Sequence, residues 1–197
     1  MYAWNLPETI NISGTDYKIR TDYRVILDIL TAMNDPEIFD PGMTEEEKNT
    51  ERVMTMLQIL YVDFDNIPVQ CWKEAAEKAC DFIDCGLKGD GRPRPRLMDW
   101  EHDAPIIAPE INKITGKDIR SEKMHWWEFF GYYMGIGRGT FQTVVGIREK
   151  LRKGQKLEKW ERDFYSNNKK LVDLKSKSTK RSEEEKSELR KLFGISK

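Results

Sequence analysis

The sequence is poor in the residues that most often hold metals or act as nucleophiles. Its 197 residues include only two histidines and three cysteines. The cysteines, Cys71, Cys80 and Cys85, are odd in number and form no CxxC pair, so we expect free thiols in a reducing compartment. Neither a GxSxG nucleophile motif nor a phosphate-binding P-loop occurs. These absences disfavour most enzyme classes, and the sequence predicts no enzymatic activity and no cofactor.

Long hydrophobic runs are also missing. A helix that spans a membrane needs about 20 consecutive apolar residues, and no segment approaches that length. The first residues, MYAWNLPETINIS, have neither the basic start nor the apolar run of a secretion signal. With 39% apolar and 34% charged residues, the composition is that of a globular protein with a heavily solvated surface. We therefore expect a soluble cytosolic protein without membrane contact.

The net charge of −1 conceals an uneven distribution. Residues 148–197 carry 17 Lys and Arg against 9 Asp and Glu, whereas the other 147 residues carry 16 against 25. A basic C-terminal third can bind nucleic acid or an acidic partner, or pair head to tail with another copy. Acidic residues run through the same stretch, which favours solvated helix faces and makes nucleic-acid binding the weaker hypothesis.

The N-terminal part predicts a hairpin and three helices. Residues 8–20 alternate between apolar and polar around a Ser-Gly-Thr-Asp turn, which is typical of a short β-hairpin. Apolar residues at helical spacing occupy 23–33, and the sequence TEEE at 44–47 is a capping box that opens a second helix. A third helix is expected between Pro68 and Gly86. The predicted inward faces of the second and third helices are Val53, Met54, Leu57, Leu60 and Tyr61, and then Val69, Trp72, Ala76, Ala79 and Phe82 or Ile83.

The second half begins with residues 88–96, KGDGRPRPR, which contain no large apolar side chain. We interpret them as a linker rather than a phosphate-contacting arm, because no aromatic residue offers a base a stacking surface. Helical patterns resume at Asp99, a candidate N-cap. The expected helices run from Asp99 to Gly116 (with Pro109 a source of a kink), over about 121–135, from Thr140, near 157–174, and over the charged segment 182–194.

These patterns predict a mainly α protein, a multi-helix bundle with a short N-terminal β-hairpin. We divide the chain into four parts by composition and pattern. They are an N-terminal part with the hairpin and helices (1–87), a linker (88–97), a C-terminal helical part that contains the aromatic helix (98–175) and a charged tail (176–197).

The densest aromatic segment is 125–137, HWWEFFGYYMGIG. A helix that is apolar almost all round lies either inside the core or between its own core and a partner. Core packing is the default interpretation. Six aromatic side chains, however, bury about 150–250 Å² each, which is more than a small helical subdomain easily covers. The residues that we assign to a partner-binding surface are Trp126, Trp127, Phe129, Phe130, Tyr132, Tyr133 and Met134.

A metal site is a further hypothesis for this segment. His125 and Glu128 are three residues apart on the expected helix, and His102 is the second histidine of the chain. Two histidines and a carboxylate suit zinc or iron. Zinc motifs on helices normally carry two histidines four apart, however, and here the pair would have to assemble from separate helices. We therefore favour a capping or core role for His125 and predict no metal.

Several segments of the chain resemble a family of bacteriophage and prophage proteins. They are TDYR (21–24), WEHDAPIIAPEIN (100–112), HWWEFF (125–130), IREK (147–150) and LEKWERDFYSNN (157–168). The genes of that family lie in the tail module, between the genes for the tail tube and the tape-measure protein. The residues that we single out by match to the family pattern are Trp100, Asp103, His125 and Arg148, together with Trp126, Trp127 and Phe129.

The resemblance implies a non-enzymatic role in building a siphophage tail. The protein would act as a tail assembly chaperone or adaptor that binds the tape-measure protein, with tail tube subunits as further candidate partners and a homo-oligomer as a candidate assembly. It would work in the host bacterial cytoplasm and be absent from the mature virion. Three alternatives remain: a nucleic-acid-associated protein that uses the basic linker and C-terminal region, a structural connector of the virion, and a metal-dependent enzyme centred on His125, Glu128 and His102.

Overall fold

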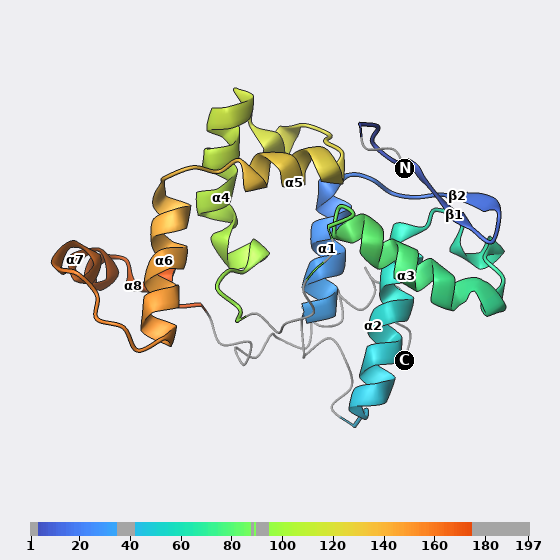
Figure 1. Cartoon of the computed structure of the whole chain (residues 1–197), viewed down its shortest axis with the longest axis horizontal. Helices are drawn as coiled ribbons and strands as arrows, with labels where there is room; N and C mark the ends of the chain where they lie inside the picture. The colour runs from blue at the N-terminus through green and yellow to red at the C-terminus, as the bar shows by residue number, and fades with distance from the viewer. Residues whose placement is uncertain (1–3, 35–41, 88, 90–94, 175–197) are drawn as a thin grey trace. The chain divides into compact units, whose positions relative to one another are not determined.

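The computed structural model of the chain describes residues 4–34, 42–87, 89 and 95–174. Over these residues the chain forms eight α-helices, three short 3-10 helices and one two-stranded antiparallel sheet (Figure 1). This confirms the predicted mainly α fold with an N-terminal hairpin. The elements are β1 (Thr9–Ile12), β2 (Thr15–Lys18), α1 (Tyr23–Asn34), α2 (Glu45–Leu60), η1 (Phe64–Asn66), η2 (Val69–Cys71), α3 (Trp72–Ile83), α4 (Trp100–Thr115), η3 (Ile119–Ser121), α5 (Trp126–Met134), α6 (Thr140–Arg152), α7 (Lys159–Asn167) and α8 (Lys169–Val172).

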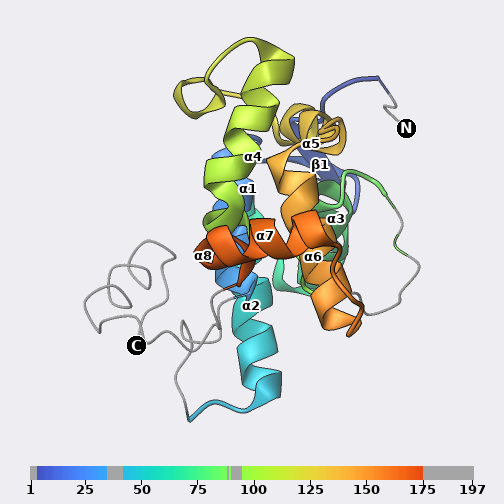
Figure 2. The same cartoon turned by 90° about the vertical axis from the view of Figure 1, so that its left-hand side faces the viewer.

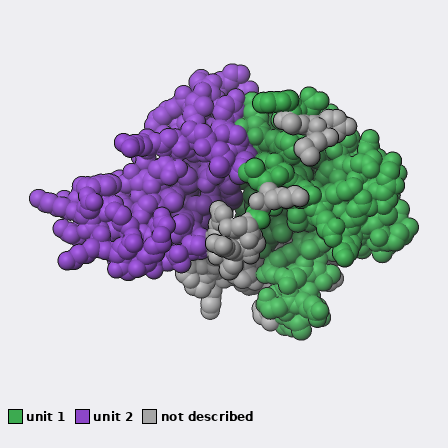
Figure 3. Space-filling model, in the orientation of Figure 1, with its two compact units in different colours: residues 1–90, 124–129, 179–197 green, residues 91–123, 130–178 purple. Residues whose placement is uncertain are grey.

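The chain divides into two compact units (Figure 3). Unit 1 comprises residues 1–90, 124–129 and 179–197, and unit 2 comprises residues 91–123 and 130–178. The sequence analysis assigned the whole aromatic helix to the C-terminal part, whereas the division falls inside α5, after Phe129. The first four residues of α5 therefore belong to the unit that is built mainly from the N-terminal part.

The hairpin turns at Ser13 and Gly14, which have φ values of 48° and 88°. Two central residues with positive φ are the mark of a type I′ turn, whose twist matches that of the paired strands. Ile12 pairs with Thr15, so the loop has two residues and Thr15 already belongs to β2. The predicted hairpin is thus confirmed with a tighter turn than the four-residue sequence suggested.

Side-chain hydrogen bonds define both ends of α2. At its start the predicted capping box is present, because Thr44 Oγ1 accepts from the Glu47 amide and the Glu47 carboxylate accepts from the Thr44 amide. At its end the Arg20 guanidinium donates to the carbonyl oxygens of Ile59 and Tyr61 at 2.7 and 2.8 Å. These carbonyls have no partner within the helix, so a donor from outside stabilises the terminus.

The inward faces of α2 and α3 are rotated slightly from the predicted ones. The apolar residues of α2 that are buried are Met56, Leu57 and Leu60, while Val53 is 37% exposed. On α3 the buried face contains Ala75 rather than Ala76. Periodicity locates an apolar stripe on a helix, but it does not show where the centre of a wide stripe lies. Val53, Met54 and Ala76 therefore flank the core instead of filling it.

Residues 124–126 return to the N-terminal part by backbone pairing. The Tyr23 amide donates to the Met124 carbonyl at 3.0 Å, and the Trp126 amide donates to the Thr21 carbonyl at 2.7 Å. An antiparallel bridge between Asp22 and His125 lies between these two hydrogen bonds. Because the two segments are far apart in sequence, no local pattern predicts their pairing, which lies at the start of the stretch 124–129 that belongs to unit 1.

Unit 2 is built from α4, α6, α7 and α8. Helix α4 has the predicted N-cap at Asp99 and the predicted end at Gly116, whose φ is 72°, and it continues across both Pro105 and Pro109. In Figure 2, α4 and α6 lie side by side and the short helices α7 and α8 run across them. The buried residues that hold these helices together are Val144, Ile147, Leu157 and Val172.

Three predictions about element boundaries need correction or lie outside the described residues. The helix expected near 157–174 is two helices, divided at Asn168. The aromatic helix begins at Trp126 rather than near 121, and the residues before it contain η3. Much of the expected linker and the expected helix at 182–194 lie outside the described residues. In the part of the chain that the structure describes, no helix is long and apolar enough to cross a membrane.

Glu74 fastens the hairpin to α3. Its carboxylate accepts hydrogen bonds from Lys78 Nζ at 2.7 Å, from Ser13 Oγ at 2.6 Å and from the Ser13 amide at 3.2 Å. The hydrogen bond from Lys78, followed by those from Ser13, lowers the pKa of Glu74 from its ordinary value of 4.5 to about 2. These contacts favour the ionised carboxylate in the folded protein.

A carboxyl group whose pKa is lower in the folded than in the unfolded protein stabilises the fold above its unfolded pKa, and this contribution is lost as the pH falls toward the folded pKa. We therefore expect Glu74→Gln to be less stable than the wild type near neutral pH. The difference in free energy of unfolding should disappear as the pH falls from about 4.5 to about 2, as measured by urea denaturation. Glu77→Gln, on the same helix but without contacts to the hairpin, is the matched control. A difference that does not change with pH would contradict this role of Glu74.

Candidate functional site

Arg148 and Asp103 form the most buried ion pair among the described residues. Arg148 exposes 6% of its side chain and Asp103 none. Arg148 Nη1 and Nη2 donate to the two carboxylate oxygens of Asp103 at 2.7 and 2.8 Å, a bidentate arrangement. The other guanidinium N–H groups donate to the backbone carbonyl oxygens of Leu97, Leu171 and Val172. All five donors of the guanidinium are thus used within unit 2, which makes the pair a structural link rather than a reactive group.

Trp100 and Tyr133 lie in the same unit and contact each other. Their ring centroids are 4.8 Å apart, and the Tyr133 ring lies 5.8 Å from that of Phe141 at the start of α6. Burial raises the pKa of Tyr133, because the phenolate form would lose its hydration. These rings join α4, α5 and α6 as apolar packing, so Trp100 also has a structural role.

His125 caps the aromatic helix. Its Nδ1 accepts a hydrogen bond from the Trp127 amide at 3.0 Å, and its Nε2 lies 3.0 Å from the carbonyl oxygen of Pro7. A carbonyl oxygen only accepts, so Nε2 carries the hydrogen and Nδ1 is left with the lone pair that the amide needs. The favoured capping role of His125 is present in the structure, with both ring nitrogens engaged.

The two tryptophans of α5 close the C-terminal end of α3. The indole N–H of Trp126 donates to the Ile83 carbonyl at 2.8 Å, and that of Trp127 donates to the Phe82 carbonyl at 2.9 Å. The last carbonyl oxygens of a helix accept no hydrogen bond from within the helix, and here each indole N–H donates to one of them. The tryptophans therefore serve as caps as well as core residues.

The residues predicted to bind a partner have different environments. Trp126 and Phe129 are buried in unit 1, where the Phe129 ring stacks on Tyr23 at a centroid distance of 4.4 Å. These two side chains are core residues and present no surface to a partner in this structure. The other five, of which Met134 is the most exposed at 64%, are Trp127, Phe130, Tyr132, Tyr133 and Met134, and their assignment to an interface stays a prediction.

The histidines give no support to the metal hypothesis. His102 Nε2 lies 3.1 Å from the Leu171 carbonyl oxygen in unit 2, whereas His125 belongs to unit 1. Over residues 4–34, 42–87, 89 and 95–174, no group of three or more His, Cys, Asp or Glu side chains is placed to hold a metal ion. Each histidine ring instead lies within hydrogen-bonding distance of a backbone carbonyl oxygen, that of Leu171 for His102 and that of Pro7 for His125.

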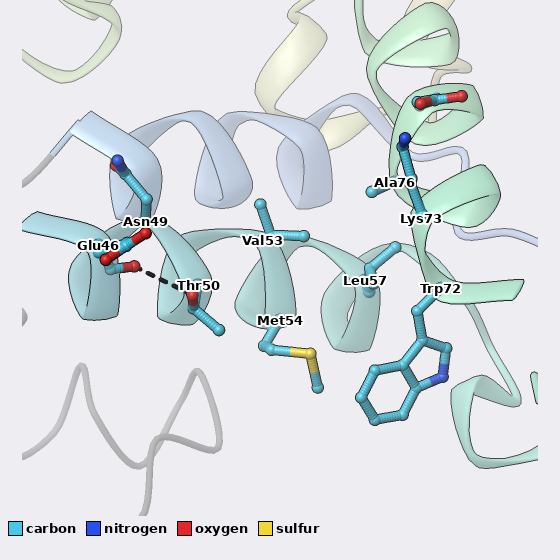
Figure 4. Close-up of a pocket in the computed structure, with 10 residues that line it drawn as sticks. Glu46, Asn49, Thr50, Val53, Met54, Leu57, Trp72, Lys73 and Ala76 are labelled. Atoms are coloured by element: carbon cyan, nitrogen blue, oxygen red, sulfur yellow. Dashed lines mark hydrogen bonds between the residues drawn. The ribbon is translucent and has the colours of Figure 1, made fainter. Parts of the chain in front are cut away.

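An apolar groove of about 500 Å³ lies between α2 and α3 in unit 1 (Figure 4). The floor of this groove, hereafter the α2/α3 groove, consists of Val53, Met54 and Leu57 on α2 and Trp72 and Ala76 on α3. The close-up shows Val53 and Met54 on one turn of α2 and Leu57 on the next, with Trp72 beyond them at the start of α3. Its rim is polar and consists of Glu46, Asn49, Thr50, Lys73 and Glu77. Apolar concavities with a few polar groups at the edge are the usual form of a binding site.

The part of the chain that contains the groove is strongly acidic. Residues 1–87 carry 17 Asp and Glu against 7 Lys and Arg. On the rim, Glu46 projects from α2 and Glu77 from α3, and neither carboxylate forms an ion pair with another described residue. Lys73 contributes a single positive charge to the same rim. The surface around the groove therefore favours positively charged groups.

Sequence analysis missed this groove because it placed Val53, Met54 and Ala76 in the core. One signal was present: the apolar residues of α2 include Val53, Met54, Met56, Leu57 and Leu60, a stripe wider than one packed face requires. The excess could have been interpreted as a second contact surface.

Substitution of Arg148 tests the buried pair. Arg148→Met would leave the Asp103 carboxylate buried without a partner of opposite charge, with the hydrogen bond from the Asp99 amide still in place, and the loss of such a partner costs about 3–5 kcal/mol of unfolding free energy. We expect a corresponding fall in stability in urea denaturation monitored by circular dichroism. Arg148→Lys should restore only part of it, because an ammonium group cannot reproduce the planar fork that contacts Asp103 and the carbonyls.

The exposed pair of Arg120 with Asp118, at 2.8 Å, supplies the matched control in the same unit. Arg120→Met removes the same kind of charge from a side chain that is 69% exposed, so its effect on stability should be much smaller. Equal losses for Arg148→Met and Arg120→Met would show that burial of the Arg148–Asp103 pair has no special importance.

Comparison with known proteins relates these features to a family. The family described as Bacteriophage Gp15 protein matches residues 4–174, a range that contains the α2/α3 groove, helix α5 and the Arg148–Asp103 pair. No curated protein and no solved structure matches the chain. The match covers most of the 197 residues and confirms the resemblance to a bacteriophage family. The chain belongs to the Bacteriophage Gp15 protein family.

Proposed function

We propose that this protein is a tail assembly chaperone or adaptor that binds the tape-measure protein while a siphophage tail is built. The observation that carries the proposal is the α2/α3 groove, an apolar concavity in a member of a bacteriophage family. A chaperone for a long helical protein needs a surface that covers apolar side chains without burying them permanently. A groove with an apolar floor and a polar rim supplies such a surface.

The buried chemistry of the chain supports a binding role. The two histidines considered for a metal site have structural partners: His102 Nε2 lies 3.1 Å from the Leu171 carbonyl oxygen, and His125 caps α5. The tape-measure protein that the resemblance implies has long helices with apolar stripes, which aggregate unless they are covered. Several copies of this chain bound along one such helix would gain avidity from weak individual contacts. Such a protein would act in the host cytoplasm and leave before the virion is complete.

Co-expression with the tape-measure protein of the same tail module tests the proposal. We expect the tape measure to be insoluble alone, and to become soluble and co-elute with the tagged chain in affinity capture and size-exclusion chromatography. A tape measure that stays insoluble, or that elutes separately, would contradict the chaperone function.

Mass spectrometry of purified mature particles distinguishes a chaperone from a structural connector. A chaperone should be absent from the particles, or far below the amount of the tail tube protein. Recovery of the chain at a fixed ratio to virion proteins would favour the connector.

A further inference from the structure

We propose that the α2/α3 groove is the docking site for one amphipathic helix of a partner protein, with an apolar stripe of about three turns flanked by Lys or Arg. This inference rests on the proposed function, because it assigns the surface and the kind of tape-measure segment that would bind there. It moves the partner site from the aromatic helix α5, where the sequence analysis placed it, to helices α2 and α3.

The dimensions of the groove fit a helix. The α2 wall extends from Glu46 to Leu57, which corresponds to about 17 Å, or three turns, at 1.5 Å per residue. A helix that lies in a groove presents residues i, i+3, i+4 and i+7, which span two turns or slightly more. The flexible thioether of Met54 at the floor can adapt to side chains of different shape. One helix of about three turns would therefore cover the floor.

The charge around the groove specifies basic flanks. Glu46 lies on α2 and Glu77 on α3, so each of the two helices contributes one carboxylate to the rim. Residues 1–87 as a whole carry ten more acidic than basic residues, 17 against 7. Lys or Arg beside the apolar stripe would be attracted, and Asp or Glu there would be repelled. The single opposing charge, Lys73, does not reverse this balance.

The basic part of the same chain is a less suitable occupant. Among its described residues, Leu157 and Val172 are buried in unit 2, and Phe164 and Leu171 pack against the same cluster, so these apolar side chains are already used. Outside the described residues, the sequence from Leu189 to Phe193 carries apolar residues at helical spacing, but a helix over it would offer a stripe only about 6 Å long. A partner helix whose apolar stripe is as long as the α2 wall matches the groove better than the described helices of the basic part or the segment from Leu189 to Phe193.

A designed peptide tests the surface directly. The probe is a fluorescein-labelled four-turn peptide with Leu at i, i+3, i+4, i+7 and i+11 and Lys at the flanking positions. A second peptide replaces every Lys by Glu. We expect the full-length protein to bind the Lys peptide at least about tenfold more tightly than the Glu peptide in fluorescence anisotropy at low salt, and the ratio to shrink as salt rises. Equal affinity for both peptides, or no binding of either, would overturn the proposal.

Variants of the groove locate the binding. Ala76→Lys places a long charged side chain on the floor and should weaken binding of the Lys peptide by about tenfold or more, while Gln58→Lys adds the same charge to an exposed position of α2 outside the groove and should not. Val53→Ser is a milder floor variant at a position that is already 37% exposed, and it should weaken binding in the same direction. The double variant Glu46→Gln, Glu77→Gln should reduce the preference for Lys over Glu flanks. If all floor variants bind like Gln58→Lys, the assignment of the groove is wrong.

Two further measurements examine the other occupants. If Leu192→Ser in the full-length chain binds the Lys peptide more tightly than the wild type, the C-terminal segment already occupies the groove and the assignment to a partner fails. If the protein self-associates in analytical ultracentrifugation and Ala76→Lys abolishes this, the occupant is a second copy and the assignment to a partner again fails. Unchanged behaviour in both measurements supports a partner helix.

The same variants separate this inference from the proposed function. Co-expression with the tape measure should succeed for the wild type and Gln58→Lys and fail for Ala76→Lys. If all three keep the tape measure soluble, the chaperone function stands and the groove is not its site. If even the wild type fails while the Lys peptide still binds the floor, the groove is a helix-binding site and the tape-measure function is wrong.

Discussion

The Arg148 guanidinium is the contact on which unit 2 depends. Removing a charge from water costs several kcal/mol, and only a partner of opposite charge with further hydrogen bonds offsets that cost. Here Asp103 supplies the charge, and the carbonyls of Leu97, Leu171 and Val172 accept the remaining hydrogen bonds. Apolar packing in this unit, such as the cluster of Val144, Ile147, Leu157 and Val172, is not directional. The bidentate pair adds direction, because it holds the start of α4, the middle of α6 and the end of α8 at one point.

The features predicted correctly from the sequence are those fixed by contacts between near neighbours. The hairpin turn, the capping box at Thr44, the cap at Asp99 and the helix end at Gly116 all involve residues within about five positions of each other. Their physical causes, positive φ and unsatisfied amides at a helix start, act on a few residues alone. The composition of a short segment is therefore enough to predict them. For Asp103 and Arg148 the family pattern identified the residues, but their pairing across 45 positions became visible only in the structure.

The aromatic helix shows what local pattern does not determine. Its composition indicates a helix whose apolar side chains are covered on nearly every side. The cover could come equally well from a partner or from the chain's own core. For Trp126 and Phe129 the structure shows burial in the chain's own core, beside the backbone pairing of Met124 with Tyr23 and of Trp126 with Thr21 and the indole hydrogen bonds to the end of α3. The same limitation explains the missed groove. Val53 and Ala76 are at core-like spacing, but α2 and α3 leave them beside the buried face rather than within it.

A chain that buries Trp126 and Phe129 of the aromatic helix and leaves Val53 and Met54 beside an open groove has properties suited to reversible binding. Trp126 and Phe129 are buried within unit 1, so they offer no contact to a partner. The floor around Val53 and Met54 offers a modest apolar area, which gives weak affinity for a single helix. Weak contacts become effective when many copies act along one long molecule, and each copy can still leave by itself. Under the chaperone function proposed above, a growing tail tube would displace one copy after another.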